Sequence, residues 1–128
     1  MIIDSSAIVA IVLKEDGYEN LIQKILSTSI LRVGAVTLLE ASIVLTHRLQ
    51  NDARTIIRDL IDEFEIEVIP FGQEHFSCAM QAFLNYGKGR NKAGLNFGDC
   101  ISYSFAITNK EPLLFIGNDF SKTDVIKA

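Results

Sequence analysis

Four acidic residues stand where a predicted strand gives way to a helix or a turn. Asp4 ends the first apolar strand, and Glu40 lies in the first turn of the helix that follows the second strand. Asp99 begins a later helix, and Asp119 follows the last long apolar strand. In a parallel sheet, ligands bind beyond the carboxyl ends of the strands. We therefore expect these four carboxylates to converge at one edge of the sheet.

Converging carboxylates predict a particular chemistry. Several of them within a few ångströms repel one another and cannot all ionise unaided. A hard divalent cation removes that repulsion, because Mg²⁺ and Mn²⁺ prefer oxygen ligands and retain several waters. Such a site is suited to phosphodiester hydrolysis, which needs no histidine as a base. This agrees with a chain whose two histidines, His47 and His75, are placed like ordinary helix-surface or core residues.

Each acid also has a purely structural interpretation. Asp4 is a possible helix cap, and Glu40 is a possible return half of a capping box that begins at Thr37. Asp99 suits the positive end of a helix dipole, and Asp119 suits a turn. The case for a metal site therefore depends on the four occurring together.

A basic loop precedes Asp99. Lys88, Arg90 and Lys92 occur within a stretch of eight residues that also holds three glycines, so the preceding helix cannot continue through it. One interpretation is a solvated loop. The other is an arm that contacts substrate phosphates at the rim of the metal site, with these three residues as the contacts.

The elements that position these residues alternate between strand and helix. This order predicts right-handed crossovers and one mainly parallel sheet with helices on both faces. The expected strands are Met1–Asp4, Leu31–Ala35, Ile66–Ile69, Pro112–Ile116 and a short last one at Val125–Ile126. The expected helices run from Ser5 or Ser6 (as cap) to Leu13, through Leu21–Leu26, from Thr37 (as cap) to about Gln50, and over Asp52–Phe64, Gln73–Tyr86 and Phe97–Thr108.

Composition limits the class of protein. The 128 residues fit a single domain over 1–128, and 48% apolar residues are enough for a substantial core. The net charge of −4 argues against a broadly basic nucleic-acid-binding surface. Without a signal-like start or a membrane-length apolar run, a cytoplasmic protein with no membrane partner is expected. Cys78 and Cys100 lack metal-site spacing and are expected to be free thiols.

The motifs around the acids resemble those of PIN-domain proteins, and among these most closely the VapC-type toxins of toxin–antitoxin pairs. The resemblance covers essentially the whole chain. It rests on four segments in this order: Ile3–Ala7, Gly34–Glu40, Phe97–Cys100 and Gly117–Phe120.

The resemblance implies a three-layer α/β/α, Rossmann-like PIN domain and a metal-dependent endoribonuclease. It implies that Asp4 and Asp99 are the principal metal ligands, with Mg²⁺ as the cofactor and Mn²⁺ able to replace it. Glu40 would complete the site directly or through water, and Asp119 would be the fourth acid unless Asn118 takes that place. Ser6 would support Asp4 by a hydrogen bond.

The resemblance also implies partners: RNA as substrate, a cognate antitoxin, and a second copy of the chain. Apolar helices point the same way, because residues 7–13 have no polar side and residues 38–45 are also largely apolar. A small three-layer domain has few places where a helix is covered all round, so one or both helices should present an apolar strip. The other interpretation is that both helices are interior.

Three alternatives stay open at this point. A receiver domain is also an acidic α/β unit, but Asp4 stands alone here and the strand at Ile66–Ile69 ends in Pro70. A non-enzymatic binding module would use the acids only as caps and turn formers. DNA is an alternative substrate, since the metal chemistry would be the same.

Overall fold

Four short parallel strands form the centre of the molecule. The computed structural model describes all 128 residues, and the sheet has the order β3-β2-β1-β4. Its strands are β1 (Ile2–Ile3), β2 (Arg32–Gly34), β3 (Glu67–Ile69) and β4 (Leu113–Leu114). Here β1 lies between β2 and β4, whereas a receiver domain places its first strand between the second and the third. The receiver alternative is therefore wrong.

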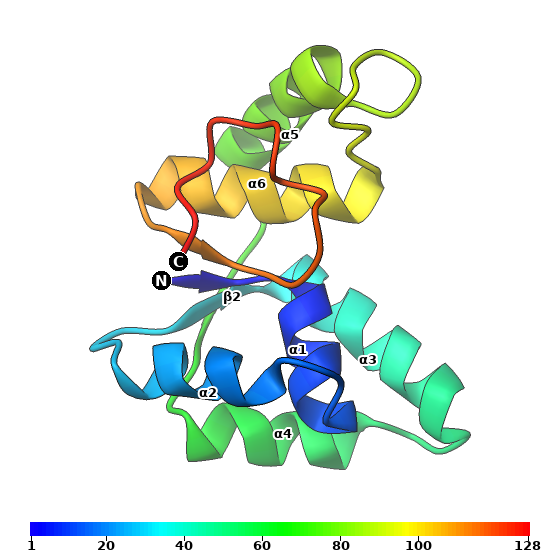
Figure 1. Cartoon of the computed structure of the whole chain (residues 1–128), viewed down its shortest axis with the longest axis vertical. Coiled ribbons are helices and arrows are strands. Elements are labelled where there is room, and N and C mark those ends of the chain that lie inside the picture. Colours follow the sequence, from blue (N-terminus) through cyan, green and yellow to red (C-terminus); the bar gives the residue numbers. More distant parts are fainter.

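Six helices cover the two faces of this sheet (Figure 1). They are α1 (Ser5–Leu13), α2 (Tyr18–Leu26), α3 (Ala35–Leu49), α4 (Arg54–Glu63), α5 (Gln73–Tyr86) and α6 (Phe97–Asn109). In Figure 1, α1, α2, α4 and most of α3 lie below the sheet, and α6 lies above it with α5 stacked on α6. The expected three-layer α/β/α architecture is confirmed.

Apolar residues alternate between the two layers along each central strand. Ile3 and Leu114 belong to the core beneath the sheet, and Ile2 and Leu113 belong to the core above it. Successive strand residues point to opposite faces, so a sheet that is covered on both sides needs an unbroken apolar run. This explains why the strands appear in the sequence as continuous apolar segments.

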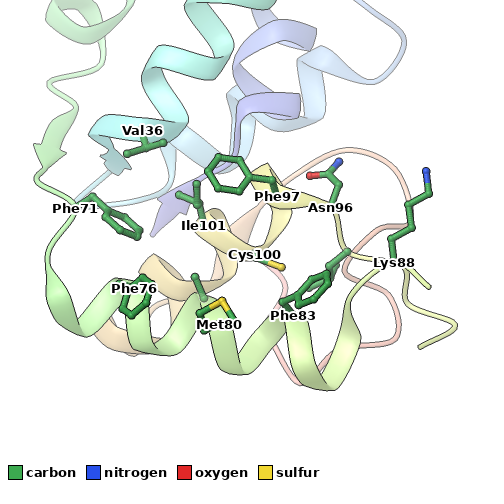
Figure 2. Close-up of a pocket in the computed structure, with 12 residues that line it drawn as sticks. Val36, Phe71, Phe76, Met80, Phe83, Lys88, Asn96, Phe97, Cys100 and Ile101 are labelled. Atoms are coloured by element: carbon green, nitrogen blue, oxygen red, sulfur yellow. The ribbon is translucent and has the colours of Figure 1, made fainter. Parts of the chain in front are cut away.

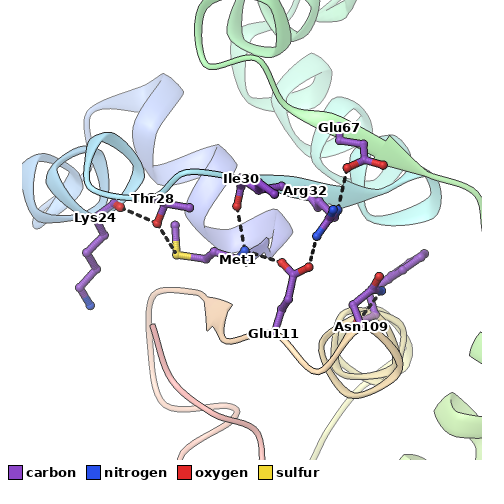
Figure 3. A network of polar contacts seen from close by, with 9 residues as sticks. Met1, Lys24, Thr28, Ile30, Arg32, Glu67, Asn109 and Glu111 are labelled. Carbon is purple, nitrogen blue, oxygen red and sulfur yellow. Dashed lines mark hydrogen bonds and ion pairs between the residues drawn. The ribbon is translucent and has the colours of Figure 1, made fainter.

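The amino-terminal edge of the sheet is joined by ion pairs (Figure 3). Arg32 on β2 contacts Glu67 on β3 (Nε–Oε2, 2.7 Å) and also Glu111, which precedes β4. Glu111 in turn pairs with the Met1 ammonium group, which also donates to the Ile30 carbonyl (2.9 Å). All four strands are thus tied together at the edge opposite the predicted site.

Helix α1 is interior, in agreement with the second interpretation of its apolar sequence. Residues 7 to 11 are all buried, because α2 and α3 pack against it. Helix α3 differs, since Leu39 and Ile43 are 58% and 60% exposed. The expected apolar strip is therefore found on α3 and not on α1.

Two predicted helix starts are wrong. The cap of α1 is Asp4, not Ser5 or Ser6. Helix α3 begins at Ala35, three residues before the expected start, so Thr37 is no cap. Thr37 is instead buried, with its hydroxyl 3.3 Å from that of Ser102 on α6.

The expected strand at residues 125–126 is reduced to a single bridge between Lys127 and Leu113. No helix of the structure has the length and apolar character that a membrane span requires.

Candidate active site

The four predicted acids lie at the carboxyl-terminal edge of the sheet. Asp4 directly follows β1, and Asp119 lies five residues after the end of β4. Glu40 is on α3, which follows β2 directly with no loop between them, and Asp99 is in the first turn of α6. The negative charges of the other three all act on the Asp99 carboxyl. The fold therefore brings all four acids within electrostatic reach of one another.

Asp4 is held rigidly. It is only 3% exposed, and its Oδ2 accepts hydrogen bonds from the Ser6 amide (3.0 Å) and the Ser6 hydroxyl (2.5 Å). The same hydroxyl accepts from the Ile116 amide (3.2 Å), just after β4. Ser6 therefore supports Asp4, as the resemblance implied, and links it to the segment that leads to Asp119. Capping and a place in the site are compatible, because the cap uses only one carboxylate oxygen.

Asp99 has a similar double role. Its Oδ2 accepts from the Asn96 amide (2.8 Å), and the Asn96 side chain accepts from the Asp99 amide (2.9 Å), which makes a reciprocal capping box at the start of α6. The pKa of Asp99 is raised to about 6, mainly by burial, with smaller contributions from the charges of Asp119, Asp4 and Glu40 and an opposing effect of the Asn96 hydrogen bond. Asp99 is therefore a partly buried acid that feels the charges of the other three.

Glu40 faces the start of α6 because α3 begins early. From the second turn of that helix its carboxylate lies against Gly98, the residue before Asp99. Burial raises the pKa of Glu40, and the charge of Asp4 adds to this, while a hydrogen bond with Ser5 lowers it. The capping-box interpretation of Glu40 is wrong, and the side chain is free for the site.

Gly98 leaves room for the Glu40 carboxylate. A Cβ at position 98 would lie 2.6 Å from Oε2 of Glu40 and closer still to Oε1. We expect Gly98→Ala to displace this flexible side chain, lowering the RNA cleavage that the resemblance implies about 10- to 100-fold while leaving the thermal unfolding midpoint nearly unchanged. Cleavage rates and melting curves of the purified variant measure both effects.

The control for this prediction is a double-mutant cycle. In a Glu40→Ala background, Gly98→Ala should cause little further loss, because the side chain that it displaces is already absent. Equal losses from Gly98→Ala in both backgrounds, or wild-type cleavage by the single variant, would contradict the role given to this glycine.

The donor set fits a hard divalent cation. Carboxylate oxygens are the ligands that Mg²⁺ and Mn²⁺ prefer. No three acidic, histidine or cysteine side chains are gathered tightly enough to hold an ion in this arrangement. Carboxylates repel one another, so without a cation they have no cause to close up. The residue types therefore fit the ion. The distances between the carboxylates would be set when the ion binds.

The structure separates the three basic residues of the loop after α5. Lys92 lines a polar hollow together with Asp119. The Arg90 guanidinium lies over the Phe83 ring, 5.8 Å from its centroid, and Lys88 is at the rim of an apolar groove. Only Lys92 is thus placed beside one of the predicted acids.

The apolar groove lies between α5 and the start of α6 and has a volume of about 570 Å³. Figure 2 shows Phe76, Met80 and Phe83 on the α5 side, opposite Val36 and Phe97. Phe97, only two residues before Asp99, is 79% exposed. A smaller hollow of about 230 Å³ shares Val36, Phe97 and Ile101 with this groove and continues it towards Glu40. We call the two hollows together the apolar trough. It is additionally lined by Phe71, Ala79, Lys88, Leu95, Asn96 and Cys100 at one end and by Leu39, Ile43, Val44 and Gly98 at the other.

The histidines and cysteines lie outside the acidic group, as expected. His47 is exposed on α3. His75 is buried 4.4 Å from the Phe105 ring, where its Nδ1 accepts from the Gly72 amide (3.0 Å). Both cysteines are free thiols.

Sequence reasoning gave no role in the site to several residues that lie around it, among them Lys122, Ser5 and Gly98. Lys122 shares the polar hollow with Lys92 and Asp119. A glycine directly before an acid at a helix start is a signal that could have indicated Gly98. Nothing in the sequence marks Lys122, which occurs in a surface turn.

Comparison with known proteins agrees with this geometry. Residues 1–126 match the PIN domain family. Ribonuclease VapC36 of Mycobacterium tuberculosis is 44% identical over 126 residues, which are 98% of this chain and 91% of that protein.

Two solved structures share the fold at low sequence identity. The M. tuberculosis toxin VapC20, described as cleaving the sarcin–ricin loop, superposes with a TM-score of 0.78 at 12% identity, covering 99% of this chain and 97% of that one. A toxin–antitoxin complex from Klebsiella pneumoniae gives 0.73 at 14% identity, with coverage of 99% and 95%. The family match and the identity to VapC36 together show that the chain belongs to the PIN-domain family and, within it, to the VapC ribonucleases.

Proposed function

We propose that this protein is a magnesium-dependent endoribonuclease and the toxin of a toxin–antitoxin pair. The observation that carries the proposal is the convergence of Asp4, Glu40 and Asp119 on Asp99, whose pKa is raised to about 6 by burial and, to a smaller extent, by these three charges. Holding four carboxylates close together costs free energy, because they repel one another unless a cation neutralises them. Membership in the VapC ribonucleases supports RNA as the substrate, and such a toxin would act in the cytoplasm.

In this proposal Asp4 and Asp99 hold Mg²⁺, and Mn²⁺ can replace it. When bound, the ion supplies a Lewis acid that polarises the scissile phosphate and activates water near neutral pH. Ser6 orients Asp4, and Asn96 orients Asp99. Each carboxylate uses one oxygen at its helix start and presents the second oxygen to the site. Glu40 completes the group directly or through water.

Asp119 is the fourth acid in the proposal. It is exposed, so its place in the site depends on the segment after β4. Asn118 is the neighbouring candidate for the same position. Substituting each residue separately by alanine distinguishes them, because only the one that serves the site should lower cleavage.

The test of the function is incubation of the purified protein with mixed RNAs, with and without Mg²⁺, followed by mapping of the new ends. We expect endonucleolytic cleavage that EDTA stops and Mn²⁺ restores, and no cleavage of matched DNA. Magnesium should also raise the unfolding midpoint, because an ion that binds only the folded state stabilises it. A protein that is neither stabilised by Mg²⁺ nor able to cut RNA would be the non-enzymatic binding module instead.

We further propose that the apolar trough is covered by association, as a homodimer and with an antitoxin. Leu39, Ile43 and Phe97 leave a large apolar surface beside the acids, which isolated surface residues do not explain. Such grooves accept amphipathic helices, and a basic antitoxin side chain would be drawn to the four acids. Light scattering of the chain alone and co-purification with the product of a neighbouring small open reading frame test this. A strict monomer that binds no such product would contradict it.

A further inference from the structure

We propose that Lys92 and Lys122 form a phosphate-binding subsite beside Asp119. This subsite would hold the RNA phosphodiester that neighbours the one that is cut. The inference rests on the proposed function and adds to it the side of the site along which the RNA backbone runs. It also assigns a role to Lys122, which lies 30 residues from Lys92 in the sequence.

The two lysines meet at a defined hollow. Its volume is about 340 Å³, and it is lined by Lys92, Ala93, Asn118, Asp119, Ser121 and Lys122. The Lys122 ammonium donates to the carbonyl oxygen of Lys92 (3.3 Å), which joins the basic loop to the segment after β4. Five of the six lining residues are polar, so the hollow suits a charged, hydrated ligand.

The turn that carries Lys122 is anchored. Phe120, two residues earlier, is 1% exposed, with its ring centroid 4.9 Å from that of Phe115. The Ser121 amide donates to the Asn118 carbonyl (2.9 Å), which closes the turn around Asp119. Lys122 is therefore placed by the core and not by a free loop.

Both ammonium groups are available for an anion. Neither Lys92 nor Lys122 takes part in any ion pair of the structure, although Asp119 is in the same hollow. Lysine is a point-charge ligand for phosphate, and the Ser121 hydroxyl and Asn118 amide supply further donors.

Asp119 couples this hollow to the metal. While its carboxylate is free, it offsets one of the two ammonium charges. Once the carboxylate takes part in neutralising a cation, the hollow carries net positive charge. Binding of RNA and of Mg²⁺ should therefore reinforce each other through this residue, and that reciprocity is a property of any two linked ligands.

The matched comparison comes from the same loop. Lys92→Ala/Lys122→Ala and Lys88→Ala/Arg90→Ala each remove two positive charges, but Lys88 and Arg90 face the apolar groove and the Phe83 ring. The experiment measures binding of a short single-stranded RNA against salt concentration, with each pair placed in the cleavage-deficient Asp99→Asn protein. Cleavage is measured with the same pairs in the otherwise wild-type chain with Mg²⁺.

We expect Lys92→Ala/Lys122→Ala to flatten the salt dependence by about 1.4, since each lost contact to a single strand contributes roughly 0.7, and to weaken binding roughly tenfold or more near 0.1 M salt. The Lys88→Ala/Arg90→Ala pair should change the slope by less than half of that. Lys92→Arg/Lys122→Arg should keep the wild-type slope, which shows that the charge matters and that the fold is retained.

Equal changes in both alanine pairs would mean that diffuse electrostatic attraction, and not a subsite, holds the RNA. An unchanged slope in Lys92→Ala/Lys122→Ala would show that the hollow holds no phosphate. Either result overturns the inference. If the wild-type chain still cleaves RNA, the proposed function is unaffected. Absence of RNA cleavage by the wild-type chain with Mg²⁺ overturns the proposed function and this inference together.

Discussion

Replacing Asp99 by asparagine is expected to abolish RNA cleavage and leave the fold intact. Asparagine still accepts a hydrogen bond from the Asn96 amide and so keeps the capping box, which means that only the charge is lost. Loss of a group that organises charge stabilisation at a reacting phosphate costs roughly a thousandfold in rate. Single-turnover cleavage with saturating Mg²⁺ is the measurement, and Asp4→Asn should behave in the same way, since asparagine also keeps the cap of α1.

The same substitution should change how stability depends on pH. The pKa of Asp99 is about 6 in the folded protein, against an ordinary value of 3.8. Between these values the folded protein binds the proton more tightly than the unfolded chain does, so the free energy of unfolding rises as pH falls from about 6 to about 4. At pH 7 this carboxyl therefore destabilises the metal-free protein, by about 1 kcal/mol once solvent screening is allowed for.

Denaturant unfolding of the metal-free wild type and of Asp99→Asn at pH 7 and at pH 4 isolates this effect. The variant should be as stable as the wild type or more stable at pH 7, and the difference should shrink at pH 4. A large loss of stability at pH 7 together with retained cleavage would mean that Asp99 serves only the capping box at the start of α6.

A second large effect is expected at Gly34, where β2 passes into α3. A Cβ there would lie 2.5 Å from Cζ of Phe105 and closer still to two other ring carbons. Phe105 is fully buried and packs against His75, with 4.4 Å between ring centroids, so the ring has little room to move. We expect Gly34→Ala to cost about 3 kcal/mol of the free energy of unfolding, the upper part of the range for overpacked cores.

Thermal unfolding measures this loss, which for a domain of this size amounts to a drop in the midpoint of roughly 10 °C. Gly72→Ala is the matched control, because a Cβ at that position meets nothing closer than His75 Nδ1 at 3.8 Å. Phe105→Leu should cost less in the Gly34→Ala protein than in the wild type, since the smaller side chain relieves the overlap. Additive losses would show that the strain is relieved elsewhere.

Much of the fold could be predicted from local patterns. Helix α5 has the expected bounds, because the apolar spacing after Gly72 and the glycines after Tyr86 both act within the segment. The strands were found because both faces of the sheet are covered, which leaves continuous apolar runs. The four acids converge because each follows an element whose place in a parallel sheet is fixed by chain order.

What could not be predicted depends on neighbours distant in the sequence. Thr37 looks like a cap, but a hydroxyl 65 residues away on α6 and the Phe105 ring against Gly34 place the start of α3 earlier. Lys122 became visible only when its turn was placed against the basic loop. The apolar sequence of α1 left open whether it faces a partner or the core, because periodicity cannot show which helices will cover it.

The order of the strands has a consequence for how the protein is made. β1 is synthesised before the other three strands and its partner β4 after them, yet the two are neighbours in the sheet. Ser6 cannot engage the Ile116 amide, and Asp119 cannot approach Asp99, until that late strand has docked. Contacts between such distant segments form slowly, after local helices. A chain whose synthesis is interrupted before β4 would therefore carry Asp4, Glu40 and Asp99 without an assembled site, so that the proposed activity would begin only once β4 and the segment with Asp119 are made.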